Sequence, residues 1–304
     1  MKDKAAWRAP ELGSAKEVQV AQGRIRYFDG GDGPPIVFVH GLFVNANVWR
    51  KIFARLTPRF RCVVLDLPFG SHELPANPDA DLSERGVVNL IADAIDEIGL
   101  QDVTLVGMDT GGAICQFLVT QRPQEIARLV LCSCDYRDNF PPRIFSYLKA
   151  LRFIQPLVPV LFAPFRLRAV RRLPVALGWL TKADLPREVE DSYSLPALDD
   201  RAVRRDVAKV TSVFDKKRLN QTADLLAEFD RPALIAWSAD DKVFPAAHAQ
   251  ALAQDLPRAR LEWIADSRTL SMEEQPARLA ALIDSFITAT ADARPHPRAH
   301  VGPH

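Results

Sequence analysis

The sequence predicts an α/β fold in which helices cover both faces of a mostly parallel central sheet. Short continuous apolar runs, typical of strands buried on both faces, recur along the chain. Amphipathic segments with apolar residues three and four apart stand between these runs, and such alternation is characteristic of a parallel sheet. The alternation stops at residue 135 and resumes at residue 228. The segment between, residues 135–227 and called the insert below, is helix-like and shows no convincing strand.

The core elements follow from this pattern in order. Two stretches of alternating polarity, Glu17–Val20 and Arg24–Phe28, predict a hairpin, and the Gly- and Pro-rich residues 29–35 predict a turn after it. The elements predicted before the insert are strand Ile36–Val39, helix Val48–Leu56, strand Cys62–Asp66, helix Ser83–Leu100, strand Val103–Val106, helix Ala113–Val119 and strand Leu129–Cys132. Those predicted after it are strand Ala233–Trp237, helix Ala246–Leu256, strand Arg260–Ile264 and helix Pro276–Ile287.

These elements predict a core of residues 17–134 and 228–288 with a helical lid, the insert, over the carboxyl edge of the sheet. Ligands bind at that edge in open α/β folds. Residues 1–16 and 289–304 lack apolar periodicity, and we expect them to be flexible tails.

The composition excludes several classes of protein. The chain has 304 residues, 48% of them apolar and 25% charged, as in ordinary globular proteins. A formal net charge of +1 lacks the basic excess on which a general nucleic-acid binder depends. The four cysteines, Cys62, Cys115, Cys132 and Cys134, lie in apolar patterns, which favours buried free thiols. We therefore expect no nucleic-acid partner, no metal and no cofactor.

We expect neither a secretory signal nor an integral membrane segment. Residues 1–13 carry charges but no apolar h-region. The most apolar stretch, Leu151–Phe165, contains Pro156, Pro159 and Pro164, which would interrupt a spanning helix. A cytoplasmic location is the resulting expectation, and a homodimer is left open.

The stretch Val103–Cys115 has the pattern of a strand, a sharp turn and a helix. Asp109 stands between Gly107 and Gly111, where G-x-S-x-G enzymes have their serine. A side chain at position 107 or 111 would crowd such a turn, and the N–H groups that begin the helix favour an anion there. Asp109 is therefore the candidate nucleophile. The alternative is that it only caps the helix.

Three motifs together resemble a known family. His40-Gly41 follows a buried strand, Gly107-x-Asp109-x-Gly111 forms the turn, and Trp237–Pro245 follows a later strand. In these motifs the chain resembles the α/β-hydrolase superfamily, within it the branch with an aspartate nucleophile: haloalkane dehalogenases, fluoroacetate dehalogenase and epoxide hydrolases. The likeness covers about residues 17–134 and 228–288. The insert matches the lid of that branch in position and length only.

The resemblance implies a two-step reaction. Asp109 would attack an sp3 carbon and form an ester while a halide or alkoxide leaves. Backbone N–H groups of Leu42, in the loop that begins with His40-Gly41, and of Thr110 would hold the carbonyl oxygen while the ester is hydrolysed.

The resemblance also implies a supporting acid. Asp241, three residues after Ser238, stands at the usual position of that acid. Some dehalogenases take it from the loop after the preceding strand, which here offers Asp135 or Asp138. A solvated loop position is the alternative for Asp241.

The catalytic histidine of the family is missing. The family has Asp-Ser-Gly-His-Phe or a near variant before the last helix, whereas this chain has Asp266-Ser-Arg-Thr269-Leu270. Thr269 cannot accept a proton near neutral pH, so ester hydrolysis loses its base. His72 is the candidate substitute because it follows a strand at the correct edge of the sheet. The other histidines lie at a position that is usually structural (His40), in a helix pattern (His248) or in the C-terminal tail (His296, His300 and His304).

Further departures bear on the substrate. Dehalogenases of this type usually have Trp directly after the nucleophile as a halide donor, and here the residue is Thr110. Epoxide hydrolases usually open the ring with lid tyrosines, a role for which Tyr147 and Tyr193 are available unless they only pack. The aromatic residues Trp179, Phe153, Phe162 and Phe165 predict an apolar inner face of the insert and a small apolar substrate.

Two functions are consistent with these features. One is a hydrolase that uses Asp109 on a small apolar substrate with a strained or halogenated carbon, as in dehalogenases or epoxide hydrolases. The other is a non-hydrolytic descendant, namely a lyase, an isomerase or a ligand-binding protein without the triad histidine. The turn around Asp109 supports the first function, and Thr269 supports the second.

Overall fold

The computed structural model describes residues 7–211 and 215–291 and contains one sheet of eight strands. The strand order is β1-β2-β4-β3-β5-β6-β7-β8, with β1 and β2 antiparallel to their neighbours and the remaining pairs parallel. The strands are β1 (Ala15–Val20), β2 (Gly23–Gly30), β3 (Pro35–Val39), β4 (Arg61–Asp66), β5 (Val103–Asp109), β6 (Ile126–Cys134), β7 (Ala233–Ser238) and β8 (Ala259–Ile264). The sheet and its mostly parallel pairing confirm the predicted fold class.

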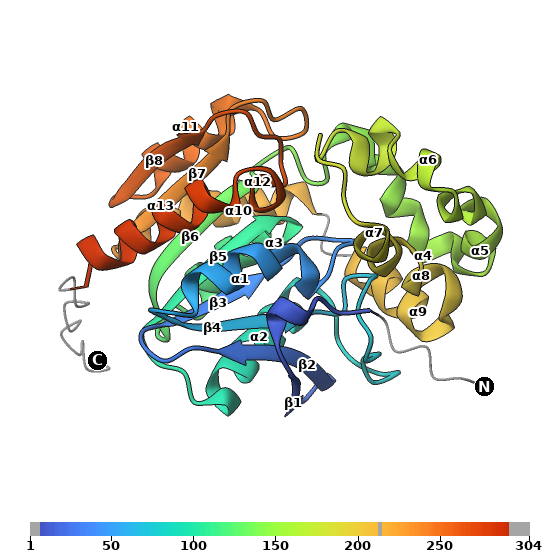
Figure 1. Ribbon diagram of the computed structural model, residues 1–304, viewed down its shortest axis with the longest axis horizontal. Helices are drawn as coiled ribbons and strands as arrows, with labels where there is room; N and C mark the ends of the chain where they lie inside the picture. The colour runs from blue at the N-terminus through green and yellow to red at the C-terminus, as the bar shows by residue number, and fades with distance from the viewer. Residues whose placement is uncertain (1–6, 212–214, 292–304) are drawn as a thin grey trace.

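Helices cover both faces of this sheet (Figure 1). On one face α1 packs against α13, and on the other α2, α10 and α11 pack with α3 or with each other. The core helices are η1 (Pro10–Leu12), η2 (Ala46–Trp49), α1 (Arg50–Leu56), α2 (Glu84–Ile98), α3 (Thr110–Gln121), α10 (Lys216–Leu225), η8 (Leu226–Glu228), α11 (Ala246–Asp255), α12 (Ser271–Glu274) and α13 (Pro276–Ala289). As the sequence predicts, the Ser83 side chain caps α2 by accepting the N–H of Gly86.

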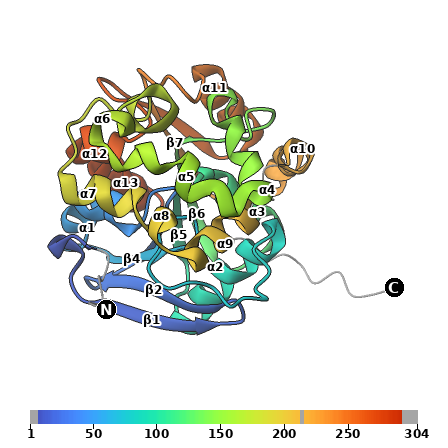
Figure 2. The same cartoon turned by 90° about the vertical axis from the view of Figure 1, so that its right-hand side faces the viewer.

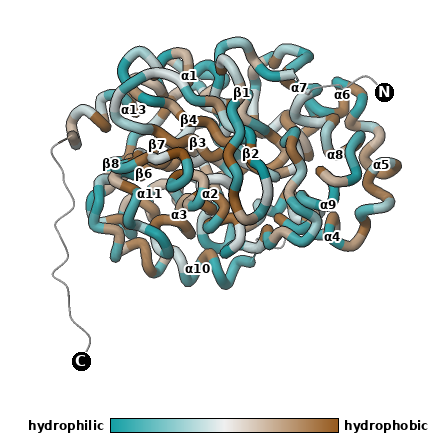
Figure 3. Tube along the Cα trace, turned by 90° about the horizontal axis from the view of Figure 1, so that it is seen from below, coloured by the Kyte–Doolittle hydropathy of each residue, from teal (hydrophilic) through white to brown (hydrophobic). Residues whose placement is uncertain are grey.

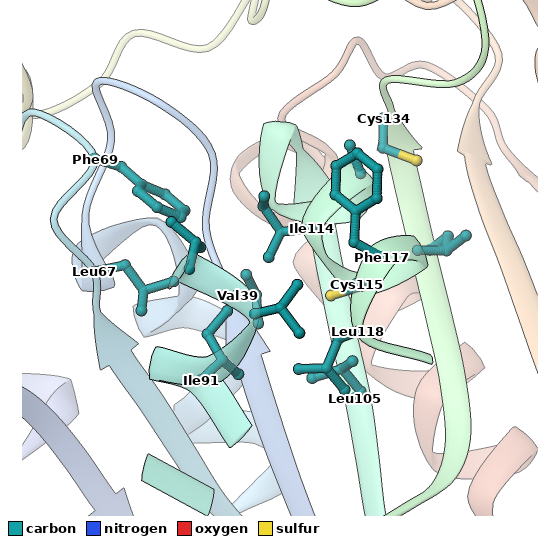
Figure 4. Close-up of a cluster of buried hydrophobic side chains, with 14 of the residues drawn as sticks. Val39, Leu67, Phe69, Ile91, Leu105, Ile114, Cys115, Phe117, Leu118 and Cys134 are labelled. Atoms are coloured by element: carbon teal, nitrogen blue, oxygen red, sulfur yellow. The ribbon is translucent and has the colours of Figure 1, made fainter. Parts of the chain in front are cut away.

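The core on the α3 face is continuous around the sheet centre. Figure 4 shows Ile114, Cys115 and Leu118 of α3 beside Val39 and Leu105 of the adjoining strands. All five side chains are fully buried. Close packing of this kind holds α3 rigidly against β3 and β5, which end at the same edge of the sheet. The four cysteines are buried and free, as predicted.

The insert lies at one end of the sheet, beyond the carboxyl ends of the parallel strands (Figures 1 and 2). Its elements, all helical and mostly short, are η3 (Arg143–Ala150), α4 (Leu151–Ile154), η4 (Gln155–Leu157), α5 (Val158–Leu161), η5 (Ala163–Arg166), α6 (Arg168–Arg171), η6 (Pro174–Gly178), α7 (Arg187–Ser194), α8 (Pro196–Asp199) and α9 (Arg201–Val210). Prolines and turns break this segment into pieces of one to three turns. Helix α10, which the predicted boundary places in the insert, instead packs against α3 and α11 over the sheet face.

The structure describes part of each of the two segments that the sequence predicts to be flexible tails. Residues 7–16 are not a flexible tail, because Ala9 and Leu12 are buried against the core and β1 begins at Ala15. The predicted C-terminal tail begins at Ala289, but α13 reaches this residue. Residues 1–6 and 292–304 of the predicted tails lie outside the described residues.

Among the described residues, one helical stretch, Arg143–Leu161, is long and apolar enough to cross a membrane by length and composition.

Candidate active site

The turn around Asp109 has the geometry that the sequence predicts. Strand β5 ends at Asp109 and α3 begins at Thr110, and Asp109 has φ 52° and ψ −134°. A non-glycine residue rarely adopts positive φ, and such strain is concentrated at functional sites. A Cβ on Gly111 would lie 2.5 Å from the carbonyl oxygen of His40, so only glycine lets α3 approach the end of β3 this closely. The turn therefore presents Asp109 at the sheet edge. Helix capping does not explain the turn, because the Asp109 side chain makes no N-cap hydrogen bond to the second or third residue of α3.

The Asp109 carboxylate lies beside the loop that follows β3. The backbone N–H groups of Thr110 and Leu42 both act on this carboxylate as hydrogen-bond donors. A Cβ on Gly41 would overlap Oδ2 of Asp109, so this loop position has room for glycine alone. Two backbone N–H groups that act on one carboxylate are the components of an oxyanion site, which stabilises an ester or its tetrahedral intermediate.

A cavity of about 130 Å³ opens above Asp109. Its floor contains Leu42, Asp109 and Thr110 from the core, and most of its wall comes from the insert. The apolar lining residues from the insert are Pro141, Pro142, Phe145, Leu148, Leu151, Val158, Phe162, Phe165, Val175, Ala176, Leu177, Leu180, Ala197, Leu198 and Val207. A small apolar molecule fits such a wall best, because a polar one would lose its hydration without new partners.

Some aromatic residues of the insert lie elsewhere than the sequence suggests. Phe162 and Phe165 line the cavity as expected. Trp179 packs against the core without lining the cavity. Phe153 points outward with 74% of its surface exposed, which contradicts an inner position. Short helices joined by prolines change direction often, and periodicity over so few residues does not define an inner face.

The protein around Asp109 makes its carboxylate hard to ionise. The pKa of Asp109 is raised from 3.8 to about 7. Burial is the main cause and the charge of Asp241 adds to it, while the N–H groups of Thr110 and Leu42 act in the opposite direction. The neighbouring Asp135 is fully buried, with Thr110 Oγ1 3.3 Å from its Oδ2. Burial, and next the charge of Asp109, raise the pKa of Asp135 well above its usual value. Asp135 has fewer donors than Asp109, so it retains its proton while Asp109 ionises.

This shift predicts a pH profile for any chemistry at Asp109. The ionised carboxylate is the nucleophile or base, so the rate should rise about tenfold per pH unit below pH 7 and level off above it. Initial rates between about pH 5 and pH 9 test this, with far-UV spectra at each pH as the control for folding. A profile that stays flat down to about pH 5 would show that Asp109 ionises at its ordinary pKa, contrary to the effect of burial.

Asp241 and Thr269 are joined where the family has an acid–histidine pair. Thr269 Oγ1 lies 3.1 Å from Asp241 Oδ1, which also accepts the N–H groups of Val243 and Phe244 at 2.8 Å each. Asp241 Oδ2 is buried and has no hydrogen-bond partner among the described residues. Burial raises the pKa of Asp241, and the donors around it act in the opposite direction. Asp241 is therefore held in place by Thr269, and its position close to Asp109 agrees with the charge effect on Asp109.

The alternative acids differ in their surroundings. Asp138 is exposed and accepts an N–H of Asn220, so it does not belong to the site. Asp135 is buried beside Thr110, but it is held in its neutral form. Of the three acids that the sequence offers, Asp241 is the one that contacts the residue in the histidine position.

The histidines of the described residues do not line the cavity. His72, the predicted substitute base, is buried with Nε2 3.2 Å from Oδ2 of Asp206 in α9, and its Nδ1 accepts the N–H of Gly70 at 3.3 Å. These contacts tie the β4 loop to the insert and give His72 a structural position. His40 accepts the N–H of Leu67 at Nε2 and donates from Nδ1 to the carbonyl of Gly41. Burial lowers the pKa of His40 to about 4, which keeps it neutral.

Both predicted tyrosines line the cavity, but their hydroxyl groups have other neighbours. Tyr147 donates its hydroxyl proton to the carbonyl of Val175 at 2.7 Å. Tyr193 lies fully buried near the ion pair of Arg50 and Glu273, whose charges act on its hydroxyl. In this arrangement Tyr147 is not free to donate to a leaving oxygen.

One lining residue is absent from the sequence-based candidates. Arg204 is the single cationic residue among those that line the cavity, and its Nη1 donates to the carbonyls of Ala197 and Leu198. No acid among the described residues pairs with it. The sequence around it contains no signal that separates it from the nearby Arg201 and Arg205.

Comparisons with known proteins agree with this geometry. The family model described as the alpha/beta hydrolase fold matches residues 34–276. Haloalkane dehalogenase 2 of Mycobacterium tuberculosis is 27% identical over 274 residues, which cover 86% of this chain and 91% of that protein. An uncharacterised protein of the same organism is 27% identical over 276 residues, covering 86% of this chain and 78% of that protein. A solved haloalkane dehalogenase loop variant from Bradyrhizobium elkanii superimposes with a TM-score of 0.76 at 18% identity, covering 92% and 98% of the two chains. The chain therefore belongs to the α/β-hydrolase fold family.

Proposed function

We propose that the protein is a hydrolase that acts on a small apolar substrate through Asp109 as the nucleophile. The observation that carries this proposal is the Asp109 carboxylate at the floor of an apolar cavity, in a strained turn and against the N–H groups of Leu42 and Thr110. An electrophilic sp3 carbon bound in the cavity accepts an electron pair from a carboxylate oxygen, and the leaving group departs with the bonding pair. The likeness to a haloalkane dehalogenase supports this class of reaction.

The ester formed on Asp109 is hydrolysed in the second step. A water attacks the ester carbonyl, whose oxygen accepts the N–H groups of Leu42 and Thr110 as negative charge develops on it. The water must lose a proton, and we propose that Asp241 Oδ2 accepts it. This oxygen is buried and unpartnered, and the pKa of its carboxyl is raised, which makes it a better base than an ordinary aspartate. The bond from the carbonyl carbon to the alkoxy oxygen of the substrate then breaks, and this oxygen takes the proton from Asp241 and leaves as the product alcohol while Asp109 is restored.

The leaving group distinguishes the candidate reactions. The Thr110 hydroxyl is directed to Asp135, so it does not replace the halide-binding indole of dehalogenases. The Tyr147 hydroxyl is directed to Val175, so ring opening by this tyrosine requires the hydrogen bond to break. Arg204 on the cavity wall is a cation that can stabilise the negative charge that develops on the leaving group. Both haloalkanes and epoxides therefore belong in the first substrate panel.

The proposal is tested by incubating the protein with a panel of short haloalkanes and epoxides and measuring both the intact mass and the released product. A product, or an adduct that maps to Asp109, supports the nucleophile. Neither product nor adduct with any member of the panel would contradict it.

The proposed role of Asp241 gives a separate prediction. Asp241→Asn should slow hydrolysis of the ester by about 10²–10⁴-fold, the usual contribution of a general base, while ester formation continues. Intact mass should then show an adduct that accumulates in the variant. Asp138→Asn, which changes an exposed aspartate near the same sheet edge, is the matched control and should behave like the parent. Equal ester lifetimes in the parent and Asp241→Asn would mean that another group is the base.

A second candidate function is supported by the Thr269–Asp241 pair. Because this pair replaces the acid–histidine pair, the protein can also be a lyase or isomerase in which Asp109, with a pKa of about 7, moves a proton and forms no ester. Exchange of a substrate proton with deuterated solvent, with no adduct and no water-derived oxygen in the product, would favour this function. Incorporation of ¹⁸O from labelled water into the product would exclude it.

A further inference from the structure

We propose that the outer face of the insert docks on an anionic lipid surface. This face is formed by α4, η4, α5 and η5 and carries what we call the apolar patch, namely Phe153, Leu157, Val160, Leu161 and Leu167. These side chains are between 54% and 74% exposed. Monomeric soluble proteins seldom leave so many large apolar side chains together in water. The brown colour of the chain at α5 marks this apolar outer end in Figure 3.

The same helical stretch is apolar on its inner side as well. Phe145, Leu148, Leu151 and Val158 line the cavity, whereas Phe153, Leu157 and Val160 point outward. A helix that is apolar all round is expected in a protein core or in contact with lipid. Here only 22% of the most apolar window of Arg143–Leu161 is buried, so the core does not account for its composition.

The stretch is suited to lie on a membrane and not to span it. A spanning helix must satisfy its backbone groups without interruption, but this stretch changes to 3-10 geometry at η4 and contains Pro156 and Pro159. Its inner side is also committed to the cavity of the folded domain. An interfacial position immerses the outward side chains and leaves the rest of the fold in water.

The charge of this region favours an anionic surface. Residues 139–183 contain eight Lys and Arg and no Asp or Glu. Five of these cations pair with acids elsewhere in the fold, namely Arg166, Arg168, Arg171, Arg172 and Lys182. The rest of the chain has 31 Lys and Arg against 38 Asp and Glu, a formal charge of −7. Within the stretch itself, Arg143, Lys149 and Arg152 have no acid partner among the described residues, and Arg152 lies over the ring of Phe153 at 4.5 Å. Unpaired cations beside exposed apolar side chains are typical of contacts with anionic headgroups.

A second copy of the chain fits the apolar patch less well than an anionic lipid surface does. In a two-fold dimer the same surface meets itself, so Arg143, Lys149 and Arg152 would oppose their own equivalents. Like charges brought together in this way oppose association. A lipid surface with negative headgroups compensates the same charges.

The cavity opens through the insert, so docking of the insert on a membrane would bring the cavity mouth to the lipid. Of the residues that line the cavity, Tyr147 and Val175 are the exposed ones, and both belong to the insert. An apolar molecule dissolved in the bilayer would then reach Asp109 without crossing water. This last step depends on the proposed function, whereas the docking itself does not.

Flotation of the full chain with vesicles tests the docking. We expect binding to vesicles of equimolar phosphatidylcholine and phosphatidylglycerol, and weaker binding to phosphatidylcholine alone. The double variant Phe153→Ser/Val160→Ser should bind the anionic vesicles at least about tenfold less tightly, because two inserted side chains are lost. The triple variant Arg143→Gln/Lys149→Gln/Arg152→Gln should lose the preference for anionic vesicles. Leu225→Ser, at an exposed leucine of α10, is the matched control and should bind like the parent.

Three results would overturn the proposal. They are no binding of the parent to either vesicle, equal binding of the parent and Phe153→Ser/Val160→Ser, and a parent dimer that this variant dissociates in the absence of vesicle binding. The last result would assign the apolar patch to a second copy. Asp109→Asn should bind vesicles like the parent. The vesicle experiment therefore tests the docking even if Asp109 proves not to be the nucleophile.

Discussion

Asp109→Asn is expected to abolish turnover, with a loss of about 10⁴-fold or more, as when other enzymes lose a nucleophile. The amide has nearly the size of the carboxylate, and its oxygen can still accept the N–H groups of Leu42 and Thr110, but it does not attack carbon. Product formation and intact mass with an active substrate are the measurements, and both product and adduct should be absent. A variant that retains full turnover would show that Asp109 is not the nucleophile.

The same substitution is expected to stabilise the fold above neutral pH. The pKa of Asp109 is raised from 3.8 to about 7 in the folded protein, so the folded state holds its proton more tightly than the unfolded chain. This stabilising contribution is complete below about pH 4 and is lost as the pH rises through 7. At pH 8 ionisation of Asp109 should therefore lower the free energy of unfolding of the parent by roughly 4 kcal/mol. Asp109→Asn has no carboxylate to ionise and should keep this stability.

Urea unfolding of the parent and Asp109→Asn at about pH 5 and pH 8 measures this difference. The gap between the two proteins should be larger at pH 8. Asp138→Asn is the control, because it makes the same substitution at an exposed position outside the cavity. An equal gap at both pH values would contradict a raised pKa at Asp109.

Thr269→His is expected to accelerate ester hydrolysis by up to about 10²–10⁴-fold, because an imidazole is a better base near neutral pH than the Asp241 carboxylate that we propose for this step. The new imidazole would stand next to Asp241 Oδ1, which now accepts the Thr269 hydroxyl at 3.1 Å and would then orient the ring. The decay of the Asp109 ester in a single turnover is the direct measurement. Thr269→Gln is the matched control, since it adds similar bulk without a group that titrates near neutral pH. No gain in a folded Thr269→His variant would mean that other parts of the site have also changed.

The fold could be predicted because its signals are local. Continuous apolar runs such as Ile36–Val39 identify strands buried on both faces. Gly107 is required by contacts within a few residues of the turn, whereas Gly111 is required by the backbone of Val39 and His40 at the end of β3. The position of Asp109 followed from the same signals. The oxyanion loop at Leu42 and the candidate positions Asp241 and Thr269 came from the resemblance to the family, and the hydrogen bond between Thr269 and Asp241 is seen only in the structure.

The insert was less predictable because its contacts are not local. Phe153 faces outward and Phe162 faces the cavity, a difference that depends on how short helices turn at Pro156 and Pro159. Arg204 differs from Arg201 and Arg205 only in the surface to which α9 happens to turn it. His72 was a reasonable substitute base by sequence position, but its partner Asp206 is 134 residues away. No pattern in the sequence joins these two residues.

Cys115 and Cys134 are packed against the glycines of the Asp109 turn. A Cβ on Gly107 would lie 2.6 Å from Sγ of Cys115, and one on Gly112 would overlap Cys134. Burial raises the pKa of both thiols well above the usual value, so the reactive thiolate is scarce in the native protein. A maleimide can therefore label these positions only when the turn itself opens. The rate of labelling at Cys115 and Cys134, measured apart from labelling at Cys62 and Cys132, thus reports how often the Asp109 turn opens, and a ligand that binds the site should slow it.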